Sequence, residues 1–94
     1  MPALSEYANV HSSAIMILRE KGFRCWVDDG TQTYRCEKGG WDFLAESPVG
    51  LLGLVAMFEH IAPTQYREYW WRQDGAPALE TLTHDAPDFV AVTQ

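Results

Sequence analysis

Apolar side chains near the start of the chain recur at the spacing of one helix face. They are Tyr7, Val10, Ala14, Ile17 and Leu18. Their separations match a repeat of about 3.6 residues per turn. Ser5 precedes the stripe as an N-cap residue, and Gly22 follows it as a residue suited to the left-handed conformation after a helix end. The pattern predicts a helix over residues 5–21, with Phe23 packing back on Leu18.

From Phe23 onward the pattern changes to alternation, which is typical of strands with one buried face. Turn sequences interrupt the alternation at residues 28–31 and 38–40, so we expect three short strands joined as an antiparallel meander. The face expected in the core carries Phe23, Cys25, Val27, Tyr34, Cys36, Trp41 and Phe43. The polar face carries Arg24, Trp26, Thr33, Arg35, Glu37 and Asp42.

Helical spacing returns after the third strand. Ser47 followed by Pro48 is a typical helix start, because serine caps the first turn and proline fits its first position. The apolar stripe that follows consists of Leu51, Leu52, Val55, Phe58 and Ala62. Pro63 ends this helix, and residues 63–73 predict a third, shorter helix.

Beyond Gly75 the periodic signal fades and prolines interrupt the chain. We therefore expect one compact α+β domain over residues 1–75, with its helices packed on one face of the sheet. Residues 76–94 form an irregular acidic extension, either docked or flexible. A chain of 94 residues buries only about 60–65% of its extended surface on folding, which leaves no room for a second domain or a deep cofactor cavity.

The charge balance narrows the choice of partners. Thirteen acidic side chains against seven basic ones give a net charge of −6. The last 21 residues contain no lysine or arginine, and their acidic residues are Asp74, Glu80, Asp85 and Asp88. Nucleic acids and anionic membranes attract lysine and arginine, so we expect neither as a partner. A basic protein partner is favoured instead.

The sequence also bears on the cellular compartment of the protein. No residue before Arg19 is positively charged, so a basic signal-peptide start is not expected. The longest apolar run, residues 49–58, is too short to span a bilayer. Two cysteines are too few for a disulfide scaffold. We expect a cytoplasmic protein.

The most unusual segment is Tyr66-Arg67-Glu68-Tyr69-Trp70-Trp71-Arg72. On a helix, Tyr66, Tyr69 and Trp70 would share one side, and Trp71 and Arg67 would point elsewhere. Either Trp70 packs on the core and an arginine covers Trp71, or Trp71, Arg67 and Arg72 form a binding hot spot. Stacking of single-stranded bases uses the same residue types but needs a positive groove.

Trp26 is the one large aromatic residue on the polar face of the predicted sheet. A tryptophan in that position is usually covered by another part of the chain. The C-terminal segment offers Leu79, Leu82 or Phe89 as the cover. Otherwise Trp26 marks a binding face.

Cys25 and Cys36 lie on the same side of the first hairpin. They are directly opposite if Gly30-Thr31 forms the turn and diagonal if Asp29-Gly30 does. Buried thiols, a redox-sensitive bridge and metal ligation are the alternatives, of which buried thiols are favoured. The histidines show no ligand spacing, and no nucleophile elbow is present, so we expect no metal, no cofactor and no catalytic set.

Gly50 and Gly53 lie inside the second predicted helix, where each costs about 1 kcal/mol relative to alanine. Close approach of the sheet or of the first helix is one reason for them. Close approach of a second subunit is another, and it would make the protein a homodimer through these glycines. An anion at the helix start, near Ser47, is a weaker third.

The function favoured by these features is a small protein-binding module, such as an inhibitor, an immunity-type protein or an adaptor. Trp71, Arg67, Arg72 and Trp26 would anchor the partner, and the acidic end would steer it. The alternative is a small-ligand-binding or catalytic domain, with a pocket between the sheet and the third helix. Its convergent polar groups would include Glu59, His60 or Asp42.

Overall fold

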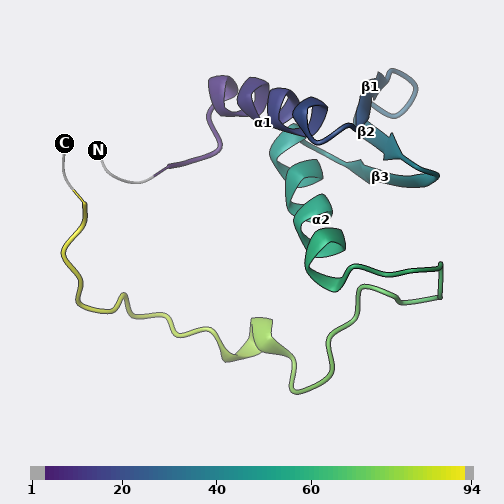
Figure 1. The fold of residues 1–94 in the computed structure, drawn as a ribbon. Helices are drawn as coiled ribbons and strands as arrows, with labels where there is room; N and C mark the ends of the chain where they lie inside the picture. Colours follow the sequence, from purple (N-terminus) through teal and green to yellow (C-terminus); the bar gives the residue numbers. More distant parts are fainter. Residues whose placement is uncertain (1–3, 93–94) are drawn as a thin grey trace.

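The computed structural model describes residues 4–92 and has an α+β architecture, as predicted (Figure 1). An N-terminal helix leads into a three-stranded antiparallel sheet, and a second helix follows. The elements are α1 (Ala8–Glu20), β1 (Arg24–Asp28), β2 (Thr33–Lys38), β3 (Trp41–Ala45), α2 (Pro48–Ile61) and the 3-10 turn η1 (Ala78–Thr81). Within this part of the chain, neither helix is long and apolar enough to cross a membrane.

The end of α1 has the predicted geometry, but its start lies further along the chain. The N–H of Phe23 donates to the carbonyl of Leu18 and that of Gly22 to Arg19, both at 3.0 Å, with Gly22 left-handed at φ 95°. These two bonds define a Schellman ending, and Leu18 and Phe23 both join the core. The N-cap is extended Tyr7 rather than Ser5, and it has no side-chain cap.

Lys38 ties the β2–β3 turn to this helix end. Its Nζ atom donates to the Lys21 carbonyl at 2.7 Å and lies 5.5 Å from the ring centroid of Phe23. The last carbonyls of a helix lack partners within the helix and carry partial negative charge. A cation from the sheet therefore satisfies one of them.

The sheet has the order β1-β2-β3, and its register decides the open question about the cysteines. Asp28 pairs with Thr33, which leaves a four-residue loop and places Cys25 directly opposite Cys36. In the loop, the N–H of Gly30 donates to Oδ1 of Asp28 at 3.1 Å. The two faces of the sheet are therefore the predicted ones.

Both helices cover the predicted core face of the sheet. The buried cluster contains Leu18, Phe23, Cys36, Phe43, Leu51 and Val55. Cys25, Tyr34 and Trp41 pack against it while half-buried. Val27 is the exception: it is 51% exposed, because it lies beside the β1–β2 loop, which projects beyond the helices (Figure 1).

The start of α2 confirms the predicted cap. The hydroxyl of Ser47 accepts from the N–H of Gly50 at 3.0 Å, and Pro48 occupies the first helical position. The helix ends at left-handed Ala62. A Cβ on Gly50 would lie 3.2 Å from that of Ala45, so close approach of the sheet accounts for this glycine. Gly53 faces open space and has no such contact.

The predicted third helix over residues 63–73 is wrong. This segment forms turns, with separate hydrogen bonds from Trp70 N–H to Arg67 and from Arg72 N–H to Tyr69. Tyr69 is left-handed at φ 59°, a conformation that ends any right-handed helix. The predicted common face of Tyr66, Tyr69 and Trp70 is therefore also wrong: both tyrosines are exposed and Trp70 is half-buried.

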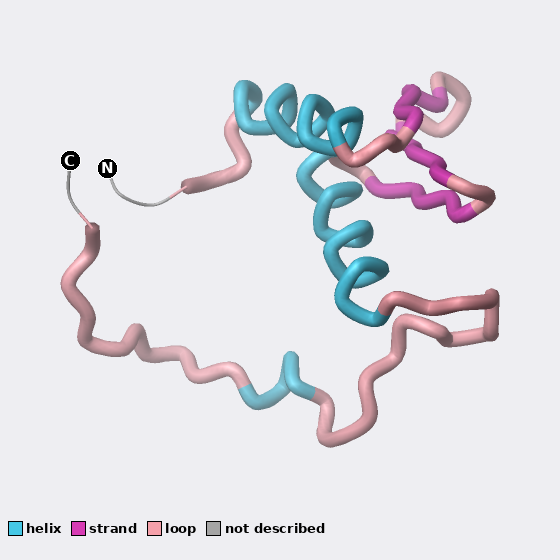
Figure 2. Tube along the Cα trace, viewed as in Figure 1, coloured by secondary structure: helices cyan, strands magenta, loops and turns pink. Residues whose placement is uncertain are grey.

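Apart from η1, residues 76–92 form an irregular segment, which is exposed except for half-buried Ala91 (Figure 2). η1 packs on none of the other helices or strands. The Cα radius of gyration is 16.0 Å, against about 12 Å for a compact chain of this length. The expectation that this segment covers Trp26 is wrong, because Leu79, Leu82 and Phe89 remain exposed.

Candidate interaction surface

Trp70 fixes the loop after α2 to the body of the protein. Its ring packs edge-on against Trp41 and Phe58, with centroid distances of 5.6 and 5.9 Å. Phe58 in turn contacts Phe43 at 5.5 Å. This aromatic contact holds residues 63–73 without a helix, because each ring contributes both buried area and favourable edge-to-face geometry.

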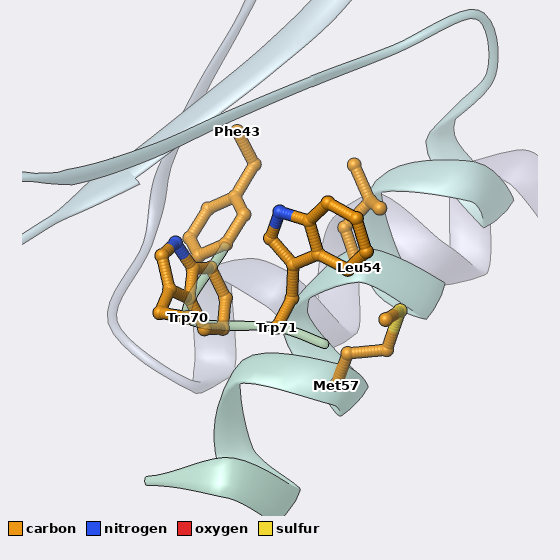
Figure 3. Close-up of a pocket in the computed structure, with 5 residues that line it drawn as sticks. All are labelled: Phe43, Leu54, Met57, Trp70 and Trp71. Atoms are coloured by element: carbon orange, nitrogen blue, oxygen red, sulfur yellow. The ribbon is translucent and has the colours of Figure 1, made fainter. Parts of the chain in front are cut away.

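The next residue, Trp71, borders an apolar pocket of about 240 Å³. Figure 3 shows the two indole rings beside Phe43, with two side chains of α2 completing the wall. The lining residues are Phe43, Leu54, Met57, Trp70 and Trp71. Trp71 stays 44% exposed at the mouth of this pocket.

A polar rim surrounds the exposed side of Trp71. The ring of Trp71 lies edge-on to that of Tyr69, with a centroid distance of 6.0 Å. The Cζ atom of the Arg72 guanidinium lies 4.5 Å from the centroid of the Tyr69 ring and 6.0 Å from that of Trp71. Arg72 forms no ion pair with any carboxylate among residues 4–92. We call Tyr69, Trp71, Arg72 and the adjoining pocket the Trp71 surface.

Arg67 lies beside this surface rather than within it. It borders a separate shallow hollow with Pro63, Thr64 and Gln65, and that hollow shares only Trp70 with the apolar pocket. Like Arg72, it makes no ion pair in the described part of the chain. The structure therefore brings Trp71 and Arg72 together, with Arg67 flanking them.

Trp26 belongs to a different surface, on the opposite face of the sheet. It pairs across the strands with Arg35, which pairs in turn with Leu44 of β3. The Arg35 guanidinium lies 5.8 Å from the Trp26 ring, and Trp26 is 45% exposed. Sequence reasoning identified Trp26 but missed Leu44, whose place in this row depends on the register of the third strand.

Ion pairs form on the same face of the sheet as the row of Trp26, Arg35 and Leu44. Arg35 bonds Asp42 at 3.0 Å and lies 3.9 Å from Asp28. Arg24 bonds Glu37 at 2.6 Å. The N–H of Gly40 also donates to Glu37, and this bond together with Arg24 lowers the pKa of the Glu37 carboxyl. Arg24 and Arg35 on the outer face are thus paired with carboxylates. Arg67 and Arg72 near Trp71 are exposed and have no ion pair among residues 4–92.

The surroundings of both cysteines disfavour the reactive thiolate form. Burial raises the pKa of the Cys36 thiol to about 11, with the neighbouring Cys25 and Asp42 adding to the shift. Burial also raises the pKa of Cys25, against a smaller opposing effect of Arg19. Both thiols are therefore protonated at neutral pH and poor nucleophiles. Over residues 4–92, no three His, Cys, Asp or Glu side chains are grouped to hold a metal.

The polar groups of the alternative site do not converge on the apolar pocket. Glu59 is engaged by Lys21 at 3.0 Å, and Asp42 by Arg35. His60 is exposed. Asp42 does line a second hollow, beside the β2–β3 turn, together with residues 64–66.

No protein-family model, curated protein or solved structure matches this chain. The candidate surface therefore has to be judged on its own geometry. Residue types identified Trp71 and Arg72 in the sequence. Leu54 and Met57, which line the pocket from α2, were not identified from the sequence. Their spacing of three residues, beside the main apolar stripe of that helix, was the available signal.

Proposed function

We propose that this protein is a protein-binding module that engages its partner through the Trp71 surface. One observation carries the proposal: a half-exposed tryptophan stands at the mouth of an apolar pocket, beside an arginine with no ion pair in the described chain. Tryptophan, tyrosine and arginine dominate binding hot spots, and all three meet here. An apolar pocket rimmed by such residues accepts an apolar side chain of a partner.

The charges of the chain support a partner that is basic overall. The net charge is −6, and four acidic residues but no lysine or arginine follow Arg72 in the sequence. A net negative charge speeds association with a positively charged surface. Added salt screens this attraction, so binding should weaken as the salt concentration rises. An inhibitor or immunity-type role fits this arrangement.

Trp26 adds a second contact on the opposite face of the sheet. In its row, Trp26 and Leu44 are exposed on either side of half-buried Arg35, and the row is separate from the Trp71 surface. Two contact surfaces on opposite faces would allow the protein to join two partners, as an adaptor does.

The test compares proteins that copurify with the wild type, Trp71→Ala and Trp26→Ala, quantified by mass spectrometry. Tyr7→Ala is the matched control, since Tyr7 is an exposed aromatic residue away from both surfaces. We expect Trp71→Ala to lose a specific partner by about 30-fold in affinity, as a hot-spot residue does, while Tyr7→Ala keeps it. Equal capture by wild type and Trp71→Ala would refute the proposal.

A second candidate, small-ligand binding, has one observation in its favour. The hollow beside the β2–β3 turn has a volume of about 420 Å³ and mixes aromatic with polar groups, among them Asp42, Thr64 and Gln65. A ligand bound there would shift the amide resonances of Gly39 and Gly40, and Asp42→Ala would abolish the shift. A fragment library that leaves these resonances unchanged would dispose of this candidate.

A further inference from the structure

The C-terminal segment, residues 76–92, leaves its large apolar side chains exposed. Five large apolar side chains are between 66% and 96% exposed: Leu79, Leu82, Phe89, Val90 and Val92. Isolated apolar residues are normal on a protein surface, but Phe89, Val90 and Val92 follow one another closely in the chain, and grouped apolar residues usually mark a contact with another molecule. Pro87 interrupts any helix that would pack such residues together.

The charges of this segment complement those of the Trp71 surface. Glu80, Asp85 and Asp88 lie among the exposed apolar residues, and no lysine or arginine follows Arg72 in the sequence. Arg72 and Arg67 in turn have no carboxylate within ion-pairing distance among the described residues. One surface offers cations beside an apolar pocket, and the segment offers carboxylates beside apolar side chains.

The apolar pocket is also large enough for an aromatic side chain of this segment. An apolar cavity of about 150 Å³ is known to hold benzene, and the pocket beside Trp71 has a volume of about 240 Å³. A phenyl ring therefore fits. Phe89 follows Asp88 directly, so a ring in the pocket would bring a carboxylate to its rim, where Arg72 lies.

The segment does not make this contact within its own chain. It runs as an open arc that stays apart from the helices and the sheet (Figures 1 and 2). Phe89 is 74% exposed, and η1 packs on no other helix or strand. The segment and the Trp71 surface of the same molecule are both left open to a second molecule.

We propose that residues 79–92 of one copy bind the Trp71 surface of a second copy, with Phe89 in the apolar pocket and Asp88 beside Arg72. Reciprocal exchange of this segment closes a two-fold dimer, in which the same contact is made twice. The inference rests on the proposed role of the Trp71 surface as a binding site. It names an acidic segment of a second copy as the occupant of that surface, in place of the basic partner that the net charge favours. The dimer would use neither Gly50 nor Gly53.

The experiment is sedimentation velocity of the full chain over a wide concentration range, for the wild type, Trp71→Ala, Phe89→Ala and the control Tyr7→Ala. We expect a wild-type dimer and an unaffected control. Trp71→Ala and Phe89→Ala should each weaken dimerisation by about 30-fold or more, as expected for a hot spot. Mixing the two variants should restore dimers in part, since the mixed pair keeps one of the two contacts: the pocket of Phe89→Ala with the phenyl ring of Trp71→Ala.

Three results would overturn the inference. The first is a wild type that stays monomeric at all concentrations. The second is a monomer whose Phe89 resonances change with Trp71→Ala, because the segment would then bind its own chain. The third is a dimer unaffected by either variant.

The outcome also separates this inference from the proposed function. A monomeric wild type whose Trp71→Ala variant still loses a copurifying protein would remove the dimer and leave the binding module standing. A variant that changes neither dimerisation nor copurification would remove both.

Discussion

Trp70 packs edge-on against Trp41 with a centroid distance of 5.6 Å, whereas the adjacent Trp71 stays 44% exposed. Two neighbouring tryptophans thus have different tasks. The first attaches the loop after α2 to the core, and the second leaves an aromatic surface exposed. Left-handed Tyr69 just before them sets the backbone direction that separates the two rings.

This division predicts different effects on stability. Trp70→Ala removes an aromatic ring from the core and should lower the free energy of unfolding by about 2–4 kcal/mol, somewhat less than a fully buried tryptophan would. Trp71→Ala should cost about 1 kcal/mol or less, since much of the ring is already in water. Urea unfolding followed by circular dichroism measures both. Equal losses would mean that Trp71 belongs to the core.

Substitution of the two glycines of α2 by alanine is expected to change the free energy of unfolding by different amounts. Gly53→Ala places a methyl group in open space and should stabilise the helix by about 0.5–1 kcal/mol. Gly50→Ala brings its Cβ within 3.2 Å of Ala45 and of the Ser47 hydroxyl, so most or all of that gain should be lost. Thermal unfolding of the two variants side by side provides the comparison.

The same pair tests whether the glycines form a subunit contact. If a second copy approached α2 at this point, Gly53→Ala would reduce self-association in sedimentation. We expect no such reduction, because the dimer proposed above uses another surface. A clear reduction would restore the glycine-mediated homodimer.

Glu37 should make stability depend on pH in the acidic range. Its folded pKa is lowered, by the Gly40 N–H and by Arg24, so the folded state binds a proton less readily than the unfolded state. The resulting stabilisation is complete above the unfolded pKa and is lost as pH falls through the folded value. Glu37→Gln should therefore be less stable than wild type at neutral pH, with the difference shrinking in acid. Glu20→Gln, in which the carboxylate removed has no ion pair in the described chain, is the control.

The cysteines should resist modification in the folded protein. Burial raises the pKa of Cys36 to about 11 and also raises that of Cys25, so little thiolate exists at neutral pH. Ellman's reagent should react slowly with the native chain and rapidly after unfolding in urea. Fast reaction of both thiols in the native state would instead support the redox-sensitive bridge considered from the sequence, for which their directly opposed positions are suitable.

Elements with strong local signals could be read from the sequence. Gly22 marks the end of α1 through the left-handed conformation it adopts, and Ser47 with Pro48 marks the start of α2. Alternation then assigned most of the sheet residues to the correct faces. Val27 was assigned to the core because alternation gives the face of a strand and not how far the covering helices reach.

The loop after α2 could not be predicted in the same way. Helical spacing of Tyr66, Tyr69 and Trp70 is a local property, while the conformation of Tyr69 accompanies the packing of Trp70 on Trp41 and Phe58. Residue type still identified Trp71 and Arg72 as candidates. The pocket beside them depends on a β3 residue, Phe43, that only the tertiary structure brings close.

The bond from Lys38 to the carbonyl of Lys21 has a consequence for how the molecule comes apart. The side chain joins the tip of the second hairpin to the last turn of α1, over the ring of Phe23. Fraying of either element breaks this bond and frees the same carbonyl, so the bond couples the opening of one element to that of the other. Acylation of this amine would cancel its charge and uncouple the helix from the hairpin.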